Sequence, residues 1–112
     1  MSRQVVRSAW FRADLAEQAS WYFEQGGFDL AERYGVTVVQ TLLRLAQDPF
    51  AGRPRRFRNP QLNGIRSITV ARPFNSHLVF YRVQGEIVVV VRVLHGARDL
   101  PRRLRQPPGS DD

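Results

Sequence analysis

Apolar residues in the first half of the chain recur with helical spacing, after a short strand-like segment. Gln4–Arg7 is predicted to form this strand, and Ser8 is placed to cap a helix that ends near residues 26–27, a pair of glycines. A second apolar stripe follows and ends at Asp48, where Pro49 stops the helix. Two amphipathic helices joined at a glycine pair predict a helical hairpin, whose apolar face must lie on another layer.

The second half of the chain predicts three strands that supply this layer. They are expected over residues 65–71, 77–83 and 86–94, and Gln84-Gly85 is a tight hairpin signal between the last two. The predicted fold class is therefore α+β, with the order β-α-α-β-β-β. The helical hairpin is expected to pack on a twisted, mainly antiparallel sheet.

The last predicted strand is strongly apolar and leads into a polar box. Residues 87–91 are all apolar, so the strand is expected to be covered on both faces, and Arg92 is the first charge inside it. The box spans residues 95–100. Within it, Asp99 is expected to be the N-cap of a short C-terminal helical segment.

The length and composition predict one domain with a modest core. The chain has 112 residues, of which 43% are hydrophobic. The domain is expected to cover residues 1–105, and the polar, proline-bearing residues 106–112 are expected to form a disordered tail. Residues 50–64, which are rich in Arg, Gly and Pro, are interpreted as an exposed basic connection rather than a secondary-structure element.

The net charge of +7 is unevenly distributed along the chain. Residues 1–48 hold five Arg and six acidic residues, a net −1, whereas residues 49–112 hold twelve Arg and four acidic residues, a net +8. The chain has no Lys, so no amine can act as a general base or form a Schiff base. All cationic contacts must come from planar guanidinium groups, which suit phosphates and carboxylates.

Several classes of protein are disfavoured by what the sequence lacks. There is no Cys and there are only two His, so neither a disulfide framework nor a metal site is expected, and no cofactor is implied. The N-terminus lacks the apolar core of a secretion signal, and no apolar run approaches the roughly 18 residues of a membrane span. We expect a cytoplasmic protein with no membrane association.

Three segments, taken together in order and spacing, resemble the ParE branch of the RelE/ParE superfamily. The segments are LAxxPxxGRPR from residue 45, FYRV from residue 80 and RVLHGARD from residue 92. The resemblance covers roughly residues 3–104. It implies the toxic half of a bacterial type II toxin-antitoxin pair, which arrests growth, with a helical hairpin packed on a twisted antiparallel sheet.

The superfamily includes two mechanisms, and the sequence departs from one of them. RelE-like members resemble ribosome-dependent endoribonucleases, which use lysines, arginines and a C-terminal tyrosine or histidine. This chain has no Lys, and Leu78 and Leu104 stand where an arginine and the tyrosine are expected; only Arg98 matches. The box ending resembles ParE-like members, which inhibit DNA gyrase without nuclease chemistry. Gyrase is the leading target, mRNA cleavage is the alternative, and a non-toxic adaptor is a third class.

The candidate site residues follow from this comparison. His95, Arg98 and Asp99 are the candidates for contacting the target. The nuclease alternative gives Arg82, Arg92, His95 and Arg98 catalytic roles, whereas gyrase inhibition requires no catalytic residue. Structural interpretations stay open: a carboxylate partner for Arg98, a helix cap for Asp99, a hydrogen-bonded structural role for His95, and separate ion pairs for Arg82 and Arg92.

The charge asymmetry and the resemblance together predict a protein partner. The resemblance implies a hetero-oligomer with a small, acidic antitoxin whose N-terminal half binds DNA. Its acidic segment is expected to lie across the sheet and the helical hairpin, attracted by the basic half of the chain. The antitoxin-binding candidates are Arg53, Arg55, Arg56, Arg58, Arg66 and Arg82.

Overall fold

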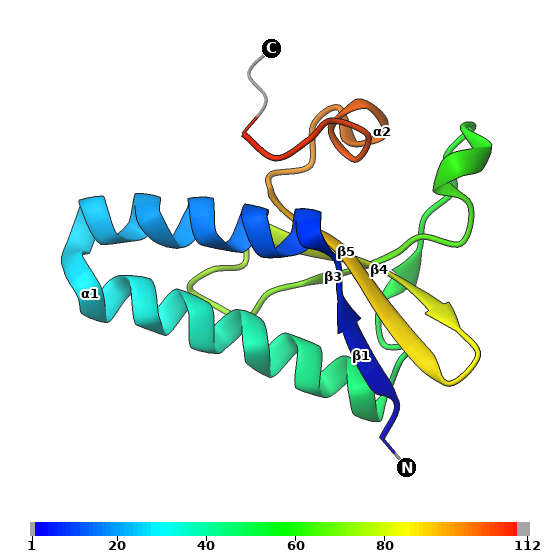
Figure 1. The fold of residues 1–112 in the computed structure, drawn as a ribbon, viewed down its shortest axis with the longest axis horizontal. Helices are drawn as coiled ribbons and strands as arrows, with labels where there is room; N and C mark the ends of the chain where they lie inside the picture. The colour runs from blue at the N-terminus through cyan, green and yellow to red at the C-terminus, as the bar shows by residue number, and fades with distance from the viewer. Residues whose placement is uncertain (1, 110–112) are drawn as a thin grey trace.

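The computed structural model describes residues 2–109, which form a five-stranded sheet covered by helices (Figure 1). In chain order the elements are β1 (Gln4–Arg7), α1 (Ala9–Gln47), β2 (Arg53–Pro54), the 3-10 helix η1 (Pro60–Leu62), β3 (Arg66–Thr69), β4 (His77–Gln84), β5 (Ile87–His95) and α2 (Leu100–Arg103). The sheet order is β1-β5-β4-β3-β2. Only the β1–β5 pair is parallel among the described strands, so the α+β class and the mainly antiparallel sheet are confirmed.

The long helical element α1 is interrupted at Gly27, where its two helical arms meet and the chain changes direction. This residue has φ 83° and ψ −168°, a conformation outside the helical region that glycine adopts without a steric penalty. Figure 1 shows the two arms of α1 folded back beside each other, with the sheet behind them. The predicted change of direction at the glycine pair is therefore correct, and the two helical arms of α1 meet at Gly27 without a loop between them.

The start of α1 is fixed by Ser8, as the sequence predicts. Its side-chain oxygen accepts a hydrogen bond from the Phe11 amide at 3.0 Å, and its hydroxyl donates to the Val91 carbonyl at 2.9 Å. The first bond satisfies one of the free amides at the helix N-terminus, and the second ties this end of the helix to β5. Asp48 caps the other end of α1, as predicted.

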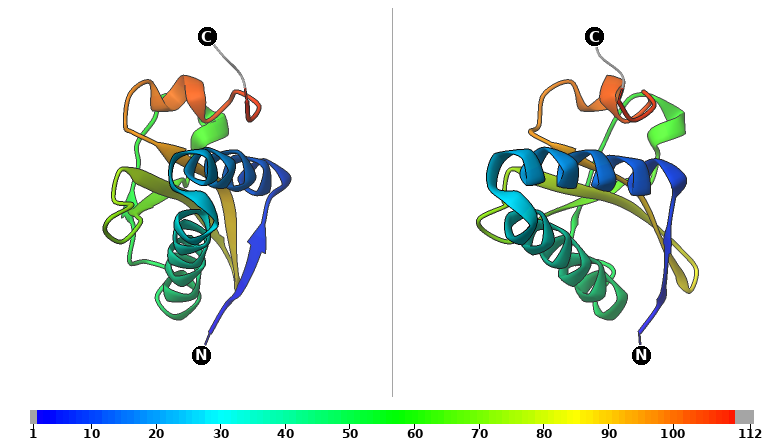
Figure 2. Two further views of the ribbon diagram at one scale, coloured as in Figure 1. Left: turned by 90° about the vertical axis from the view of Figure 1, so that its left-hand side faces the viewer. Right: turned by 60° about the vertical axis from the view of Figure 1, so that its left-hand side comes forward.

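Each face of the sheet packs against its own hydrophobic cluster. Neighbouring residues on β4 and β5 point to opposite faces, so Val79 and Val93 pack beneath α1 whereas Phe80 and Leu94 pack beneath α2 and η1. The second cluster consists of Leu62, Ile65, Phe80, Leu94, Leu100 and Leu104. Figures 1 and 2 show η1 and α2 side by side at the end of the molecule away from the start of β1.

An irregularity in the β4–β5 ladder changes which side chains of β5 face the helices. Phe80 pairs with Arg92 but Tyr81 pairs with Val90, so Val91 is an extra residue on β5. A single extra residue reverses the alternation of the strand beyond it. As a result Val93 lies in the cluster under α1, whereas Arg92 shares the opposite face with Phe80.

The predicted covering of β5 on both faces is only partly realised. Val88 and Val90 are fully buried under α1, but Ile87, Val89 and Val91 are half-buried on the other face. The second cluster reaches only the C-terminal half of the strand, where Leu94 is buried. The apolar run of this strand therefore leaves a partly open surface at its middle.

Two expectations about loops need correction or completion. Residues 50–64 are not without structure, since they contain β2, which pairs with β3, and η1, whose first turn begins with Pro60. In the predicted tail, Gln106 is bound to the domain by its carbonyl, which accepts a hydrogen bond from Arg92 at 2.6 Å. Residues 110–112 of that tail lie outside the described residues.

Candidate functional site

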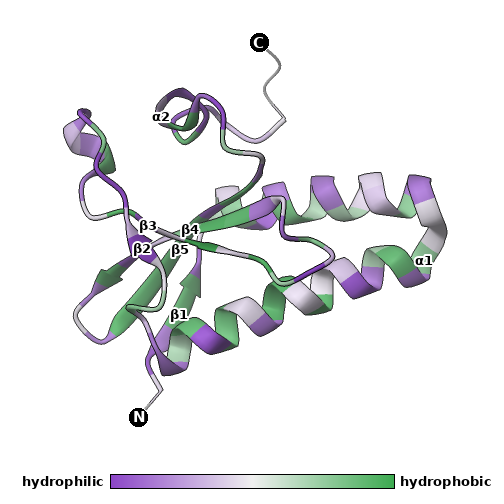
Figure 3. Ribbon diagram, turned by 180° about the vertical axis from the view of Figure 1, so that it is seen from behind, coloured by the Kyte–Doolittle hydropathy of each residue, from purple (hydrophilic) through white to green (hydrophobic). Residues whose placement is uncertain are grey.

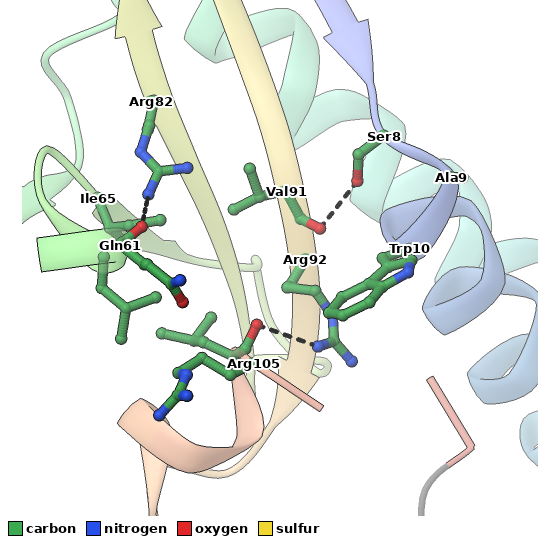
Figure 4. Close-up of a pocket in the computed structure, with 11 residues that line it drawn as sticks. Ser8, Ala9, Trp10, Gln61, Ile65, Arg82, Val91, Arg92 and Arg105 are labelled. Atoms are coloured by element: carbon green, nitrogen blue, oxygen red, sulfur yellow. Dashed lines mark hydrogen bonds between the residues drawn. The ribbon is translucent and has the colours of Figure 1, made fainter. Parts of the chain in front are cut away.

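A cavity of about 460 Å³ opens between the start of α1, η1 and the end of α2 (Figure 4). Its floor is made by side chains of the second cluster and by the extra residue of β5. Arg82 of β4 and Trp10 of α1 lie on opposite sides of it, and Arg105 lies beside α2 (Figure 4). The apolar floor residues are Leu62, Ile65, Val91 and Leu104.

Three arginines line this cavity, but their charges are not equivalent. Arg82 donates to the carbonyl oxygens of Gln61 and Asn63, which are neutral acceptors, and Arg105 is exposed. Arg92 is buried, and its charge is neutralised by a carboxylate. The residues around the cavity include no Asp or Glu in the described chain. Arg82 and Arg105 therefore leave a positive potential at the rim.

The carboxylate that pairs with Arg92 belongs to Asp14 of α1. The two groups form a bidentate pair, with Nε to Oδ2 at 2.7 Å and Nη2 to Oδ1 at 2.9 Å, and each side chain is only 5% exposed. Asp14 also accepts a hydrogen bond from the Val93 amide at 3.2 Å. The remaining guanidinium nitrogen of Arg92 donates to the carbonyls of Arg103 and Gln106. These bonds of Arg92 tie α1, β5 and α2 together. The structure thus confirms the ion-pair interpretation that the sequence left open for Arg92.

The predicted antitoxin-binding arginines divide into two groups. Arg55 and Arg66 are bound within the domain, Arg55 to the Ser67 hydroxyl at 2.7 Å and Arg66 to the Gly52 carbonyl at 3.0 Å. Partial burial, and then the nearby charge of Arg53, lower the pKa of Arg55. By contrast, Arg53, Arg56 and Arg58 are exposed. The segment 53–58 is largely hydrophilic in Figure 3 and leads directly into η1.

Residues 96–99 of the polar box form an exposed turn between the end of β5 and the start of α2. Arg98 and Asp99 are both exposed, and no carboxylate pairs with Arg98 among the described residues. Asp99 occupies the predicted N-cap position, but its backbone is left-handed (φ 53°) and its side chain makes no capping bond; it instead pairs with Arg102 at 3.1 Å. The expected side-chain cap is therefore wrong, and both side chains are accessible to a partner.

The four residues proposed for nuclease chemistry do not converge on one cavity. Arg82 and Arg92 line the cavity described above, whereas His95 lines two cavities on the side of α1, one of which it shares with Arg92; Arg98 lines none of these three cavities. Leu104, which stands at the expected tyrosine position, is only 6% exposed and belongs to the second cluster. Within residues 2–109, no three His, Asp or Glu side chains gather closely enough to hold a metal ion. None of the helices in that range is long and apolar enough to cross a bilayer.

Comparison with known proteins places this architecture in a family. Residues 5–100 match the family described as the ParE toxin of the type II toxin-antitoxin system parDE. The chain belongs to the ParE toxin family. A search of curated proteins finds no match.

Solved structures share the fold of this ParE toxin. The chromosomal ParDE toxin-antitoxin system from P. aeruginosa aligns with a TM-score of 0.70 and 21% identity, covering 86% of this chain and 98% of that one. The RelBE2 toxin-antitoxin complex from Mycobacterium tuberculosis aligns with a TM-score of 0.60 and 25% identity, covering 85% of this chain and 92% of that one. A mutant of the E. coli toxin RelE in the free state aligns with a TM-score of 0.50 and 14% identity, covering 96% of this chain and 95% of that one.

The two histidines of this ParE toxin form a pair that the sequence does not reveal. They are cross-strand partners on β4 and β5, and their ring centroids are 4.9 Å apart. His77 is only 2% exposed, and its Nε2 lies 2.9 Å from the Tyr22 hydroxyl. Its Nδ1 is buried and has no hydrogen-bond partner within residues 2–109. Burial, and then the nearby His95, lower the pKa of His77 to about 4.

The buried His77 is expected to make stability fall in mild acid. Its pKa is lower in the folded state than the ordinary value of about 6.5 in the unfolded chain, so protons bind the unfolded chain preferentially between these values. We expect the free energy of unfolding to fall by about 2 kcal/mol between pH 7 and pH 5 from this group alone, and this loss to level off below pH 4.

Urea unfolding of the wild type and of His77→Phe at pH 7, 6 and 5 measures this effect. The variant is expected to lose this part of the pH dependence, whatever its stability at pH 7. His95→Phe is the matched control, and it should retain most of the wild-type slope, because burial is the larger cause of the low His77 pKa and the nearby His95 the smaller one. Equal slopes in the wild type and His77→Phe would contradict the assignment.

Two residues of the site, Asp14 and Trp10, were not among the candidate site residues predicted from the sequence. Asp14 offered a signal, since it lies three residues after Phe11 on the apolar face of the first helix, where a carboxylate needs a partner. Trp10 offered none, because its position beside Arg92 depends on where β5 passes the start of α1. Its ring lies 5.2 Å from the Arg92 guanidinium carbon, close enough for a cation–π contact.

Proposed function

We propose that this ParE toxin is held inactive by direct binding of a cognate acidic antitoxin and, when released, inhibits DNA gyrase without cutting nucleic acid. The match to the ParE family over residues 5–100 carries the proposal. The proposed site of action is the bacterial cytoplasm, where both the antitoxin and gyrase are met. Inhibition by binding fits a chain whose candidate nuclease groups are dispersed.

The side chains support binding rather than RNA cleavage. Cleavage through a 2′-hydroxyl requires a base, an acid and cations around one phosphate. Here Arg92 is committed to Asp14, and His95 does not line the cavity that holds Arg82. Leu78 and Leu104 supply no polar group at the other two positions. A protein surface made by His95, Arg98 and Asp99 requires no such convergence.

The partner proposal draws on the charge of the exposed loop. Arg53, Arg56 and Arg58 are exposed beside β2 and have no acidic neighbour in the segment 53–58. Such a surface raises the association rate of an acidic partner and is screened by salt. The ParDE and RelBE2 structures are toxin-antitoxin systems, which is consistent with an antitoxin partner for this chain.

Expression in bacteria without the antitoxin tests the target. We expect growth arrest, gyrase-dependent DNA breaks and intact transcripts. Arg98→Ala should reduce toxicity at least about tenfold in viable counts without changing the fold, because truncating an interface arginine often costs more than 1 kcal/mol of binding. Arg44→Ala, which removes an exposed arginine on the outer face of α1, is the matched control and should remain toxic.

Each other outcome has a defined meaning. Site-specific mRNA cuts that disappear in Arg98→Ala would overturn the gyrase proposal in favour of the endoribonuclease. Unimpaired growth with folded protein would indicate the non-toxic adaptor. An equal loss of toxicity in Arg44→Ala would contradict a specific role of Arg98 in contacting the target.

A further inference from the structure

We propose that the cavity between α1, η1 and α2 takes one apolar anchor side chain from an acidic peptide segment of the partner. This inference rests on the proposed function, because it assigns the partner's neutralising segment to a defined pocket. It also goes beyond the arginines predicted to bind the antitoxin, of which only Arg82 lines this cavity.

The floor of the cavity is built to receive an apolar group. The buried residues Leu62, Ile65 and Leu104 of the second cluster form the base of the cavity, and the half-buried Val91 adds accessible apolar surface. Trp10 forms one wall and is 40% exposed, although its ring is a large apolar surface. The volume of about 460 Å³ falls within the roughly 300–1,000 Å³ typical of ligand pockets. An apolar side chain here would remove the exposed Trp10 ring and the accessible part of Val91 from water.

The rim of the cavity selects for negative charge beside that apolar group. The Arg82 guanidinium is held in place by two carbonyl oxygens, and Arg105 is exposed beside the opening. Asp14 neutralises only Arg92, and no carboxylate of residues 2–109 lines this cavity to pair with Arg82 or Arg105. A carboxylate on either side of the anchor side chain would form an ion pair with the guanidinium group of Arg82 or Arg105.

The basic segment 53–58 extends this complementarity beyond the cavity. It runs into η1, and η1 itself supplies Gln61 and Leu62 to the cavity wall. An acidic peptide attracted by the exposed arginines of this segment would therefore reach the opening along the same surface. Nucleic acid shares the negative charge, but it does not supply an aliphatic anchor for the leucine-rich floor. The chemistry favours an acidic peptide with an apolar residue.

A fluorescence titration of the full chain tests the pocket. Trp21→Phe leaves Trp10 as the sole tryptophan. The probe is the synthetic peptide Glu-Asp-Leu-Phe-Glu-Asp with blocked ends. We expect a saturable change in Trp10 fluorescence, a weaker response when Ser replaces the Leu-Phe pair, and affinity reduced about tenfold by Arg105→Glu. Arg44→Glu, which makes the same charge change on an exposed part of α1 outside the cavity, should alter the affinity less than about twofold.

Several results would overturn the proposal. These are the absence of a saturable response, equal binding of the Ser-substituted peptide, and equal weakening by Arg44→Glu. Tighter, Arg105-dependent binding of single-stranded oligo-dT would assign the cavity to nucleic acid instead. Toxicity in cells is scored separately. Loss of peptide binding with gyrase-dependent toxicity intact refutes only the pocket, whereas peptide binding by a non-toxic chain refutes the proposed function.

Discussion

Asp14→Ala is expected to lower the free energy of unfolding by about 3–5 kcal/mol, the largest effect of any single substitution considered for this toxin. The substitution leaves the Arg92 guanidinium buried without its carboxylate, and the Val93 amide loses an acceptor. An uncompensated buried charge is far more costly than the loss of the pair itself. For a domain of this size such a loss approaches the total stability. Urea unfolding at pH 7 measures it.

A double variant separates the buried charge from the loss of packing. Asp14→Leu combined with Arg92→Met removes both charges, so it is expected to be more stable than Asp14→Ala alone. It should remain less stable than the wild type, because the carbonyls of Arg103 and Gln106 lose their donor. If Asp14→Ala loses less than about 1 kcal/mol, the ion pair does not have the structural role assigned to it.

Gly52→Ala is expected to lower the free energy of unfolding by about 3 kcal/mol, although it adds only a methyl group. A Cβ at this position would lie 2.5 Å from the Tyr81 hydroxyl and 2.6 Å from the Ser67 carbonyl oxygen. The Tyr81 hydroxyl accepts a hydrogen bond from the Gly52 amide at 2.9 Å and donates to the Pro49 carbonyl at 2.8 Å. The added methyl must therefore disrupt this buried junction, which joins the basic segment to β4.

Gly35→Ala is the matched control for this substitution. Gly35 lies inside α1, and a Cβ there meets no atom within 4 Å. Because alanine favours the helix more than glycine does, we expect stability to rise by about 0.5–1 kcal/mol. Thermal unfolding followed by circular dichroism compares the two variants. A neutral Gly52→Ala would contradict the close approach of Tyr81.

These contacts explain why segments far apart in sequence occur together in the ParE pattern. The LAxxPxxGRPR segment supplies Pro49 and Gly52, and the FYRV segment supplies Tyr81, whose hydroxyl joins them. The RVLHGARD segment supplies Arg92, which binds α1 and α2. These motif residues have structural roles, so their presence identifies the fold. The exposed His95, Arg98 and Asp99 remain candidates for the function.

The element order was predictable because local patterns dictate it. Ser8 caps α1 through its own hydroxyl, Gly27 supplies the bend, and Gly85 has the positive φ of 60° that the tight β4–β5 turn requires. β2 was missed because two residues with a proline carry no periodicity. Their pairing with β3 comes from the chain that surrounds them.

By itself, the sequence determined the α+β architecture and the basic character of the second half of the chain, since these depend on periodicity, turn residues and charge counts, and its three motif segments indicated the family by resemblance. Only the tertiary structure decided which charges are available. The extra residue Val91 reverses the alternation of β5, which places Arg92 where Asp14 can pair with it and brings His95 against His77. Ladder register and the meeting of residues 78 positions apart are non-local, so Arg82 and Arg105 were distinguished from Arg92 only once the chain was folded.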